Sequence, residues 1–366
     1  MKAILMLEDG KSFTGEALGT SGESIGEVIL NTAVVGYQEM MTDPANAGKI
    51  LVLTYPLIGN YGCAPKFNES KNIWLSGLVI KEKSRIFSNW QARMSFDDFI
   101  KGHKLLTISG VDTRTLAVHL RQKGQMLGII STKSFEVKEL LSRIDAFRKK
   151  RAESLLPRIS TTKPKRLGRE KAKYRIAILD LGVTNSIIRQ LELLGLSISV
   201  LPYNISPREL LRLKPAGLII SNGPEEDAGL KDVVSNVKQL IKKLPILGIS
   251  TGHQVLALAL GAKIARLKLG HRGLNYPLYN PASYKGEITV QNHSFAVDAD
   301  SLNKIKDVKI TSYNLNDRTV EEMESRKLKL IGVQYYPVSP GFNEVNSIFK
   351  KFLKLIKKPA CRQAGR

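Results

Sequence analysis

Short apolar runs separated by glycine-rich turns dominate the first half of the chain. Such runs, bounded by turn residues, are typical of β-strands. We expect strands at Lys2–Leu7, Glu27–Asn31, Ile50–Thr54 and Gly77–Ile80. A helical spacing of apolar positions predicts helices over Ser95–Lys101 and Asp112–Lys123, and Gly124 fits the carboxyl-terminal cap of the second helix. The first half therefore reads as a mixed α/β domain.

The second half alternates apolar strand patterns with amphipathic helical patterns. The strands are expected at Arg175–Leu179, Ser197–Leu201, Gly217–Ser221 and Pro245–Ile249, and the helices at Ser186–Leu194, Lys231–Lys243 and Gly252–Leu260. This alternation predicts a mainly parallel sheet flanked by helices. Because chemistry in such sheets lies at the carboxyl ends of the strands, residues 221–224 and 248–252 are the first candidates for a site.

A basic segment separates the two halves. Residues 148–173 hold 11 basic and 2 acidic residues, together with Pro157, Pro164 and Gly168. Few large apolar residues interrupt it, as is typical of a solvated linker. We therefore predict a first domain over 1–150, a linker over 151–173, a second domain over 174–358 and an unstructured tail over 359–366.

Composition narrows the classes of protein that the chain can belong to. The chain has 366 residues, 43% of them hydrophobic, and a formal net charge of +23. No apolar stretch approaches the roughly 18 residues that span a bilayer, so we expect no membrane partner and a cytoplasmic location. Two cysteines exclude a disulfide framework and a four-thiolate zinc site. Five scattered histidines show no ligand spacing, so we expect neither a metal nor a cofactor in this chain.

One strand-to-helix junction carries a recognisable chemical pattern. The fragment Gly248-Ile249-Ser250-Thr251-Gly252 has the form G-x-S-x-G. In this nucleophile elbow a sharp turn lifts one side chain above the sheet, and a backbone N–H at the helix start can stabilise an oxyanion. By itself the pattern suggests a serine hydrolase with a histidine base.

Longer motifs resemble one family in particular. The stretches PILGISTGHQVLALALGAK, SNGP, KLGHRGLNYP and QNHSFAVD resemble a class I glutamine amidotransferase domain. The stretches GEVILNTAVVGYQEMMTDPANAGKILVLTYPLIGNYG and GVDTRTLAVHLRQKG resemble the amino-terminal domain of the carbamoyl phosphate synthase small subunit. The resemblance covers roughly residues 1–150 and 174–355 and leaves out the basic segment and the tail.

The resemblance implies a function and a partner. Members of this family hydrolyse glutamine and pass the ammonia through a tunnel to a large subunit. That partner uses ATP, and by implication Mg²⁺, to make carbamoyl phosphate for arginine and pyrimidine biosynthesis. In the family a Cys nucleophile, a His base and a Glu that orients the His carry out the hydrolysis.

The sequence departs from the family at all three of these catalytic positions. Ser250 stands in place of the Cys, Tyr336 in place of the His and Val338 in place of the Glu. A serine hydroxyl is a far weaker acid than a thiol and needs a well-placed base. A phenol with an ordinary pKa of about 10 is a poor base at neutral pH, and valine cannot accept a hydrogen bond. His253 and His293 are expected to be structural histidines.

The expected glutamine pocket differs as well. Ala45 replaces a Ser, Glu225 a Gly, Thr251 a Leu and Ser294 a Gly, whereas Gly223, Gln254, Asn292 and Phe295 match the family. Glu225 adds bulk and negative charge beside the expected carboxylate site of glutamine. Glutamine is therefore expected as a ligand only if this altered pocket still works.

These departures lead to one hypothesis and three alternatives. The hypothesis is a small subunit that has lost glutaminase activity and remains a structural or regulatory partner of the large subunit. The alternatives are a subunit with residual hydrolysis, a serine hydrolase or acyltransferase that uses Ser250, and a nucleic-acid-binding protein that uses the basic segment. The basic segment lacks the interleaved aromatics of single-strand binders, which argues against the last of these.

Overall fold

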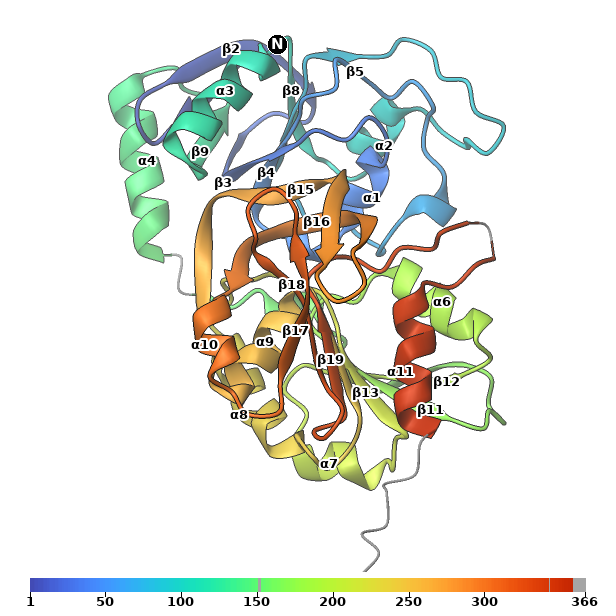
Figure 1. Ribbon diagram of the computed structural model, residues 1–366. Helices are drawn as coiled ribbons and strands as arrows, with labels where there is room; N and C mark the ends of the chain where they lie inside the picture. The colour runs from blue at the N-terminus through green and yellow to red at the C-terminus, as the bar shows by residue number, and fades with distance from the viewer. Residues whose placement is uncertain (151–152, 342, 358–366) are drawn as a thin grey trace, which may run out of the picture. The chain divides into compact units, whose positions relative to one another are not determined.

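The computed structural model describes residues 1–150, 153–341 and 343–357, which form two compact units (Figure 1). The first unit comprises Met1–Glu153 together with Lys268–Gly273. The second comprises Ser154–Leu267 and the residues from Leu274 onward. The predicted unstructured tail, 359–366, lies outside the described residues.

Seven strands of the first unit close into a barrel in the order β1-β2-β8-β6-β4-β3-β9. They are β1 (Lys2–Leu7), β2 (Ser12–Gly19), β3 (Glu23–Asn31), β4 (Lys49–Leu53), β6 (Gly77–Val79), β8 (Leu106–Ser109) and β9 (Met126–Ser131), and a small separate sheet pairs β5 (Leu57–Ile58) with β7 (Glu82–Lys83). The four strands predicted from the sequence are all present. Closure of the barrel was not predicted, because it depends on pairings between strands far apart in the chain.

Helices lie between and after the barrel strands. They are α1 (Tyr37–Thr42), α2 (Phe96–Gly102), α3 (Thr113–Lys123) and α4 (Val137–Lys150), with short 3-10 helices η1 (Pro44–Asn46) and η2 (Pro65–Phe67). The predicted helices α2 and α3 are confirmed, and Gly124 caps α3 with a φ of 98°. Alternate residues of β1 face different cores, since Leu5 packs with α3 and Met6 packs with α4.

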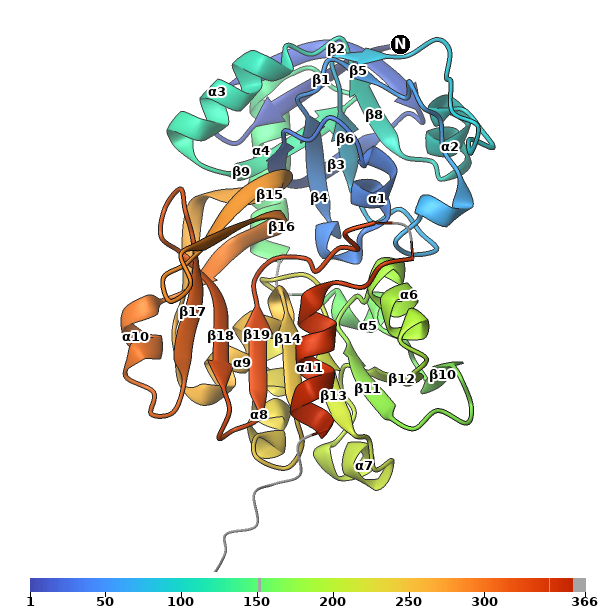
Figure 2. The ribbon, with the colours of Figure 1, turned by 45° about the vertical axis from the view of Figure 1, so that its right-hand side comes forward.

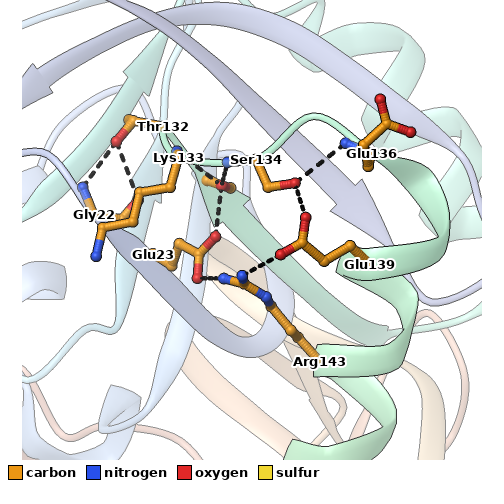
Figure 3. Close-up of polar contacts among 9 residues, drawn as sticks. Gly22, Glu23, Thr132, Lys133, Ser134, Glu136, Glu139 and Arg143 are labelled. Atoms are coloured by element: carbon orange, nitrogen blue, oxygen red, sulfur yellow. Dashed lines mark hydrogen bonds and ion pairs between the residues drawn. The ribbon is translucent and has the colours of Figure 1, made fainter.

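A polar network joins the start of β3, the end of β9 and α4 (Figure 3). Glu23 accepts a hydrogen bond of 2.9 Å from the Ser131 hydroxyl and pairs with the guanidinium of Arg143. Glu139, one helical turn before Arg143, pairs with the same guanidinium. The network thus fixes α4 against the strand ends with charged groups while the apolar face of the helix is buried.

The second unit contains a ten-stranded sheet in the order β10-β12-β11-β13-β14-β19-β18-β17-β15-β16. Its strands are β10 (Lys165–Gly168), β11 (Arg175–Asp180), β12 (Ser197–Pro202), β13 (Gly217–Ile220), β14 (Ile246–Ile249), β15 (Ile264–Asn280), β16 (Lys285–Val297), β17 (Lys309–Asn314), β18 (Val320–Ser325) and β19 (Leu330–Val333). The pairs linking β12, β11, β13, β14 and β19 are parallel, as predicted. An antiparallel extension follows from β19 through β18 and β17 to β15.

Helices cover both faces of this sheet (Figure 2). They are α5 (Leu156–Ile159), α6 (Asn185–Leu193), α7 (Pro207–Arg212), α8 (Leu230–Leu240), α9 (Thr251–Leu260), α10 (Ala299–Asn303) and α11 (Ser347–Lys357). Helices α8 and α9 pack on one face, and α6 and α11 pack on the other. The parallel strands are apolar on both faces because both are buried. None of the helices formed by residues 1–150, 153–341 and 343–357 has both the length and the apolar character needed to cross a bilayer.

The segment predicted to be a linker is folded from Ser154 onward. Leu156 of α5 is fully buried in the core of the second unit. Strand β10 pairs antiparallel with β12 at the edge of the large sheet. Its side chains are exposed, so basic residues are tolerated there while the backbone completes the sheet. The linker prediction was wrong here, because the pattern of charges along a segment indicates whether its side chains are exposed but not whether its backbone pairs with a strand. Residues 151–152 lie outside the described part of the chain.

Candidate functional site

The strand-to-helix turn between β14 and α9 forms the predicted elbow. Ser250 has φ 52° and ψ −112°, a conformation that is strained for a residue with a side chain. Its backbone N–H donates to the Val333 carbonyl of β19 at 2.8 Å. The N–H groups of His253 and Gln254 donate to the Ser250 carbonyl at 2.9 and 3.1 Å. These backbone hydrogen bonds, on both sides of the turn, stabilise the strained conformation of Ser250.

The two glycines of the elbow allow backbone segments to approach closely. A Cβ atom on Gly248 would lie 2.5 Å from the Gly252 carbonyl oxygen. A Cβ atom on Gly252 would lie 2.1 Å from the Ile220 carbonyl oxygen at the end of β13. Both distances are far below contact distance, so the G-x-S-x-G pattern is a steric requirement of this turn.

The Ser250 hydroxyl is buried without a hydrogen-bond partner. The residue is 0% exposed, and its Oγ atom makes no hydrogen bond within the described part of the chain. A serine nucleophile needs a base in hydrogen-bond contact that can take its proton. Ser250 therefore occupies the elbow position, and no base among the described residues contacts its hydroxyl.

Tyr336 follows the carboxyl end of β19 and is engaged by two amide side chains. Its phenol oxygen accepts hydrogen bonds from Asn222 Nδ2 at 3.3 Å and from Asn292 Nδ2 at 3.4 Å. Its backbone N–H donates to the Val290 carbonyl at 2.9 Å. The parallel sheet thus brings the predicted base position to the same edge as Ser250, but with a phenol in place of an imidazole.

Val338 does not orient any neighbour through its side chain. It is 38% exposed, and only its backbone forms hydrogen bonds. The segment is held instead by Gln190 of α6, whose Nε2 donates to the Pro337 carbonyl at 2.7 Å and whose Oε1 accepts from the Asn346 N–H at 2.8 Å. Gln190 therefore links the two ends of this loop.

His253 and His293, the two histidines weighed in the sequence as possible bases, are both buried. His253 is completely buried, and a Cβ atom on Gly332 of β19 would lie 2.5 Å from its Nδ1 atom. Burial lowers the pKa of His253 to about 3 because desolvation disfavours the imidazolium. His293 Nδ1 lies 2.8 Å from the Phe295 carbonyl. Neither ring forms a hydrogen bond with Ser250.

Glu225 carries the most informative contacts of the predicted pocket. The residue is 8% exposed, so its carboxylate is buried. One oxygen accepts from Gln254 Nε2 at 2.7 Å and from the Phe295 N–H at 3.2 Å. The other oxygen accepts from the Ser294 N–H at 2.6 Å. Four of the predicted pocket positions therefore come together through a single carboxylate.

The remaining pocket positions divide between the two units. The Thr251 hydroxyl donates to the Gly223 carbonyl at 2.5 Å, so these two positions also meet. A Cβ atom on Gly223 would lie 2.1 Å from the Leu181 carbonyl oxygen, which explains the glycine. Ala45 belongs to the first unit, where its N–H donates to Asp43 Oδ1 at 2.9 Å in η1.

Sequence reasoning placed Asn222 among the candidate residues 221–224 but gave it no role, and it missed Gln334. Asn222 donates to Tyr336, and Gln334 Oε1 lies 3.3 Å from Gln254 Nε2. Asn222 lies two residues after the end of β13, and Gln334 directly follows β19, so both lie at the carboxyl edge of the sheet. That position was the available signal, because polar residues at this edge converge.

Both halves of the chain match known families. Residues 5–130 match Carbamoyl-phosphate synthase small chain, CPSase domain, and residues 177–355 match Glutamine amidotransferase class-I. The Carbamoyl phosphate synthase small chain of Chlorobaculum tepidum is 40% identical over 97% of this chain and 98% of its own length. Those of Syntrophotalea carbinolica and Akkermansia muciniphila are 38% and 39% identical, over 98% and 97% of this chain and 98% of each relative.

Proposed function

Because this chain belongs to the carbamoyl phosphate synthase small chain family, we propose that it pairs with a large subunit and no longer hydrolyses glutamine. The similarity over nearly the full length supports the subunit identity. The state of the elbow supports the loss of hydrolysis. The two parts of the proposal are independent, since a subunit can keep its fold and its partner after losing its chemistry.

One observation carries the loss of activity: the Ser250 hydroxyl is buried and has no hydrogen-bond partner among the described residues. The side chain at the base position, Tyr336, has its oxygen engaged by two asparagines. Loss of the base or the nucleophile in such a dyad typically costs several orders of magnitude in rate. Here both residues differ from the family.

A serine hydrolase or acyltransferase requires more than the strained elbow. The positive φ of Ser250 does present the side chain as such enzymes do. These enzymes also need a base on the hydroxyl, and both nearby histidines are placed elsewhere. Residual glutamine hydrolysis meets the same obstacle. The noncatalytic subunit is therefore the function that the geometry supports best.

The proposed role is to stabilise or regulate a large subunit that draws on free ammonia. The large subunit would bind ATP and Mg²⁺ and would form carbamoyl phosphate for arginine and pyrimidine biosynthesis, in the cytoplasm. No part of that chemistry is assigned to residues of this chain. Its own contribution is a folded amidotransferase-type domain joined to a small-subunit amino-terminal domain.

The direct test is glutamate release from glutamine by the purified complex of this chain with its large subunit. We expect no release above a protein-free blank, because Ser250 lacks a base. A known glutaminase added to the same reaction confirms that glutamate would be detected. Robust release that depends on this chain would refute the loss of activity and leave the subunit identity intact.

A further inference from the structure

We propose that the Glu225 carboxylate is an internal ligand that fills a carboxylate-binding subsite beside Ser250 and keeps free α-amino acids out. This inference deepens the proposed function and rests on it for the identity of the pocket. It concerns binding, whereas the proposed function concerns hydrolysis. The two can therefore fail separately.

The donors around Glu225 form a receptor for one carboxylate. The successive N–H groups of Ser294 and Phe295, in β16, reach its two oxygens at 2.6 and 3.2 Å. Gln254 Nε2, from α9, donates at 2.7 Å to the oxygen that Phe295 also reaches. Successive backbone N–H groups combined with a side-chain amide are a common way to hold a carboxylate. These three donors are neutral, so the negative charge they hold comes from Glu225.

The orientation of Gln254 is fixed independently of Glu225. Its Nε2 atom lies 3.1 Å from the Phe295 carbonyl and 3.3 Å from Gln334 Oε1. Removal of the Glu225 side chain would therefore leave the donor in place. The pocket is built so that a second carboxylate could take the position of the first.

The subsite lies close to the nucleophile position. Gln254 is four residues after Ser250, and its backbone N–H donates to the Ser250 carbonyl. One helical turn rises about 5.4 Å, which is comparable to the reach of an amino acid from its carboxylate to its side-chain end. A free α-amino acid in this pocket would compete with Glu225 for the same three donors.

A purely structural role would make Glu225 the anchor of its loop. The neighbouring acidic residues already anchor that loop by other contacts, because Glu226 pairs with Arg266 and Asp227 accepts from the Leu156 N–H at 3.2 Å. The fold of the loop therefore does not depend on Glu225 alone. Glu226→Ala is therefore a matched control, because it removes a carboxylate from the same loop but not from the subsite.

The first test is chemical rescue in the full chain. Glu225→Ala empties the subsite, so sodium acetate should raise the melting temperature of this variant saturably, above the effect of sodium chloride at equal ionic strength. Wild type, Glu225→Gln and the control Glu226→Ala should respond equally to the two salts, because in each of them the subsite is filled. An equal response of folded Glu225→Ala to acetate and chloride would overturn the proposal.

The second test measures the binding of free amino acids directly. Calorimetric titration of wild-type chain with L-glutamine and with L-glutamate should give no saturable binding, whereas Glu225→Gly should bind at least about tenfold more tightly than wild type, since the donors are then free. Saturable binding of either amino acid to wild type at the affinity of Glu225→Gly would show that Glu225 does not fill the subsite. This binding readout is unaffected by whether glutamine is hydrolysed.

Discussion

Our proposal of a noncatalytic subunit rests on three side chains near the carboxyl edge of the large sheet. Ser250 has the strained backbone of the elbow, Tyr336 stands at the position predicted for the base, and Glu225 accepts hydrogen bonds from Gln254, Ser294 and Phe295. Each change by itself could be neutral. In our proposal, they together leave Ser250 without a proton acceptor and occupy the donors that would hold a substrate carboxylate.

Restoring the nucleophile alone should not restore hydrolysis. In Ser250→Cys the thiol gains acidity, but Tyr336 still cannot serve as base and Glu225 still occupies its donors. We expect glutamate release by the complex to stay at the level of the blank. A gain of about a hundredfold or more over wild type would contradict the argument from the pocket.

The buried histidine should make the protein sensitive to acid. His253 has a pKa of about 3 in the folded chain, against about 6.5 in the unfolded chain, so between these values only the unfolded state binds the proton. Its contribution to stability is present above pH 6.5 and is lost as the pH falls toward 3. The loss should be roughly 1.4 kcal/mol per pH unit within that window.

Urea unfolding of wild type and His253→Gln between pH 4 and pH 8 measures this contribution. The difference in unfolding free energy between wild type and the variant should be constant above pH 7, where the His253 imidazole is neutral in both the folded and the unfolded chain. It should shrink as the pH falls below 6.5. A difference that is independent of pH over the whole range would show that His253 is protonated equally in both states.

At the scale of elements, the elbow depends on backbone contacts between β13, β14 and α9. Gly248 and Gly252 allow the strand end and the helix start to lie against neighbouring carbonyl groups. The segment 154–173 is also defined by its backbone. Its basic side chains are exposed, whereas α5 adds Leu156 to the core and β10 pairs with β12 at the sheet edge. Backbone environment, and not side-chain character, defines both elements.

Gly252→Ala should therefore be strongly destabilising. The new Cβ atom would lie 2.1 Å from a carbonyl oxygen, and overpacking of this kind costs about 3 kcal/mol or more when backbone must move. Gly261→Ala is the control, since Gly261 has φ 98° and open space around it. Conformational strain alone should cost the control about 1–2 kcal/mol in urea unfolding. Equal costs for the two variants would mean that the turn relaxes freely.

At the scale of the whole molecule, the chain keeps two units with separate cores. The barrel unit and the sheet unit each bury extensive apolar clusters, and both match family domains over most of their length. The departures from the family pattern fall at the predicted catalytic and pocket positions, whereas the cores of both units are apolar. This pattern supports retention of the chain as a folded partner.

The source of nitrogen tests this role in the assembled enzyme. In the complex with its large subunit, ammonium should support carbamoyl phosphate formation, and glutamine should support at least about a thousandfold less, because no ammonia is released at Ser250. Omitting this chain from the assay shows what the large subunit does alone. Equal rates with glutamine and ammonium would be incompatible with the proposal.

The sequence by itself predicted eight of the strands, five of the helices and the elbow, and it marked Ser250, Tyr336 and Val338 as departures from the family pattern. These features are local: apolar spacing reports burial, and G-x-S-x-G specifies a turn that only glycines allow. Only the tertiary structure decided that the first unit closes into a barrel, that β10 joins the sheet and that Glu225 meets Gln254 and residues 294–295. Those contacts join segments far apart in the chain, and their partners are chosen by packing geometry, which no local pattern records.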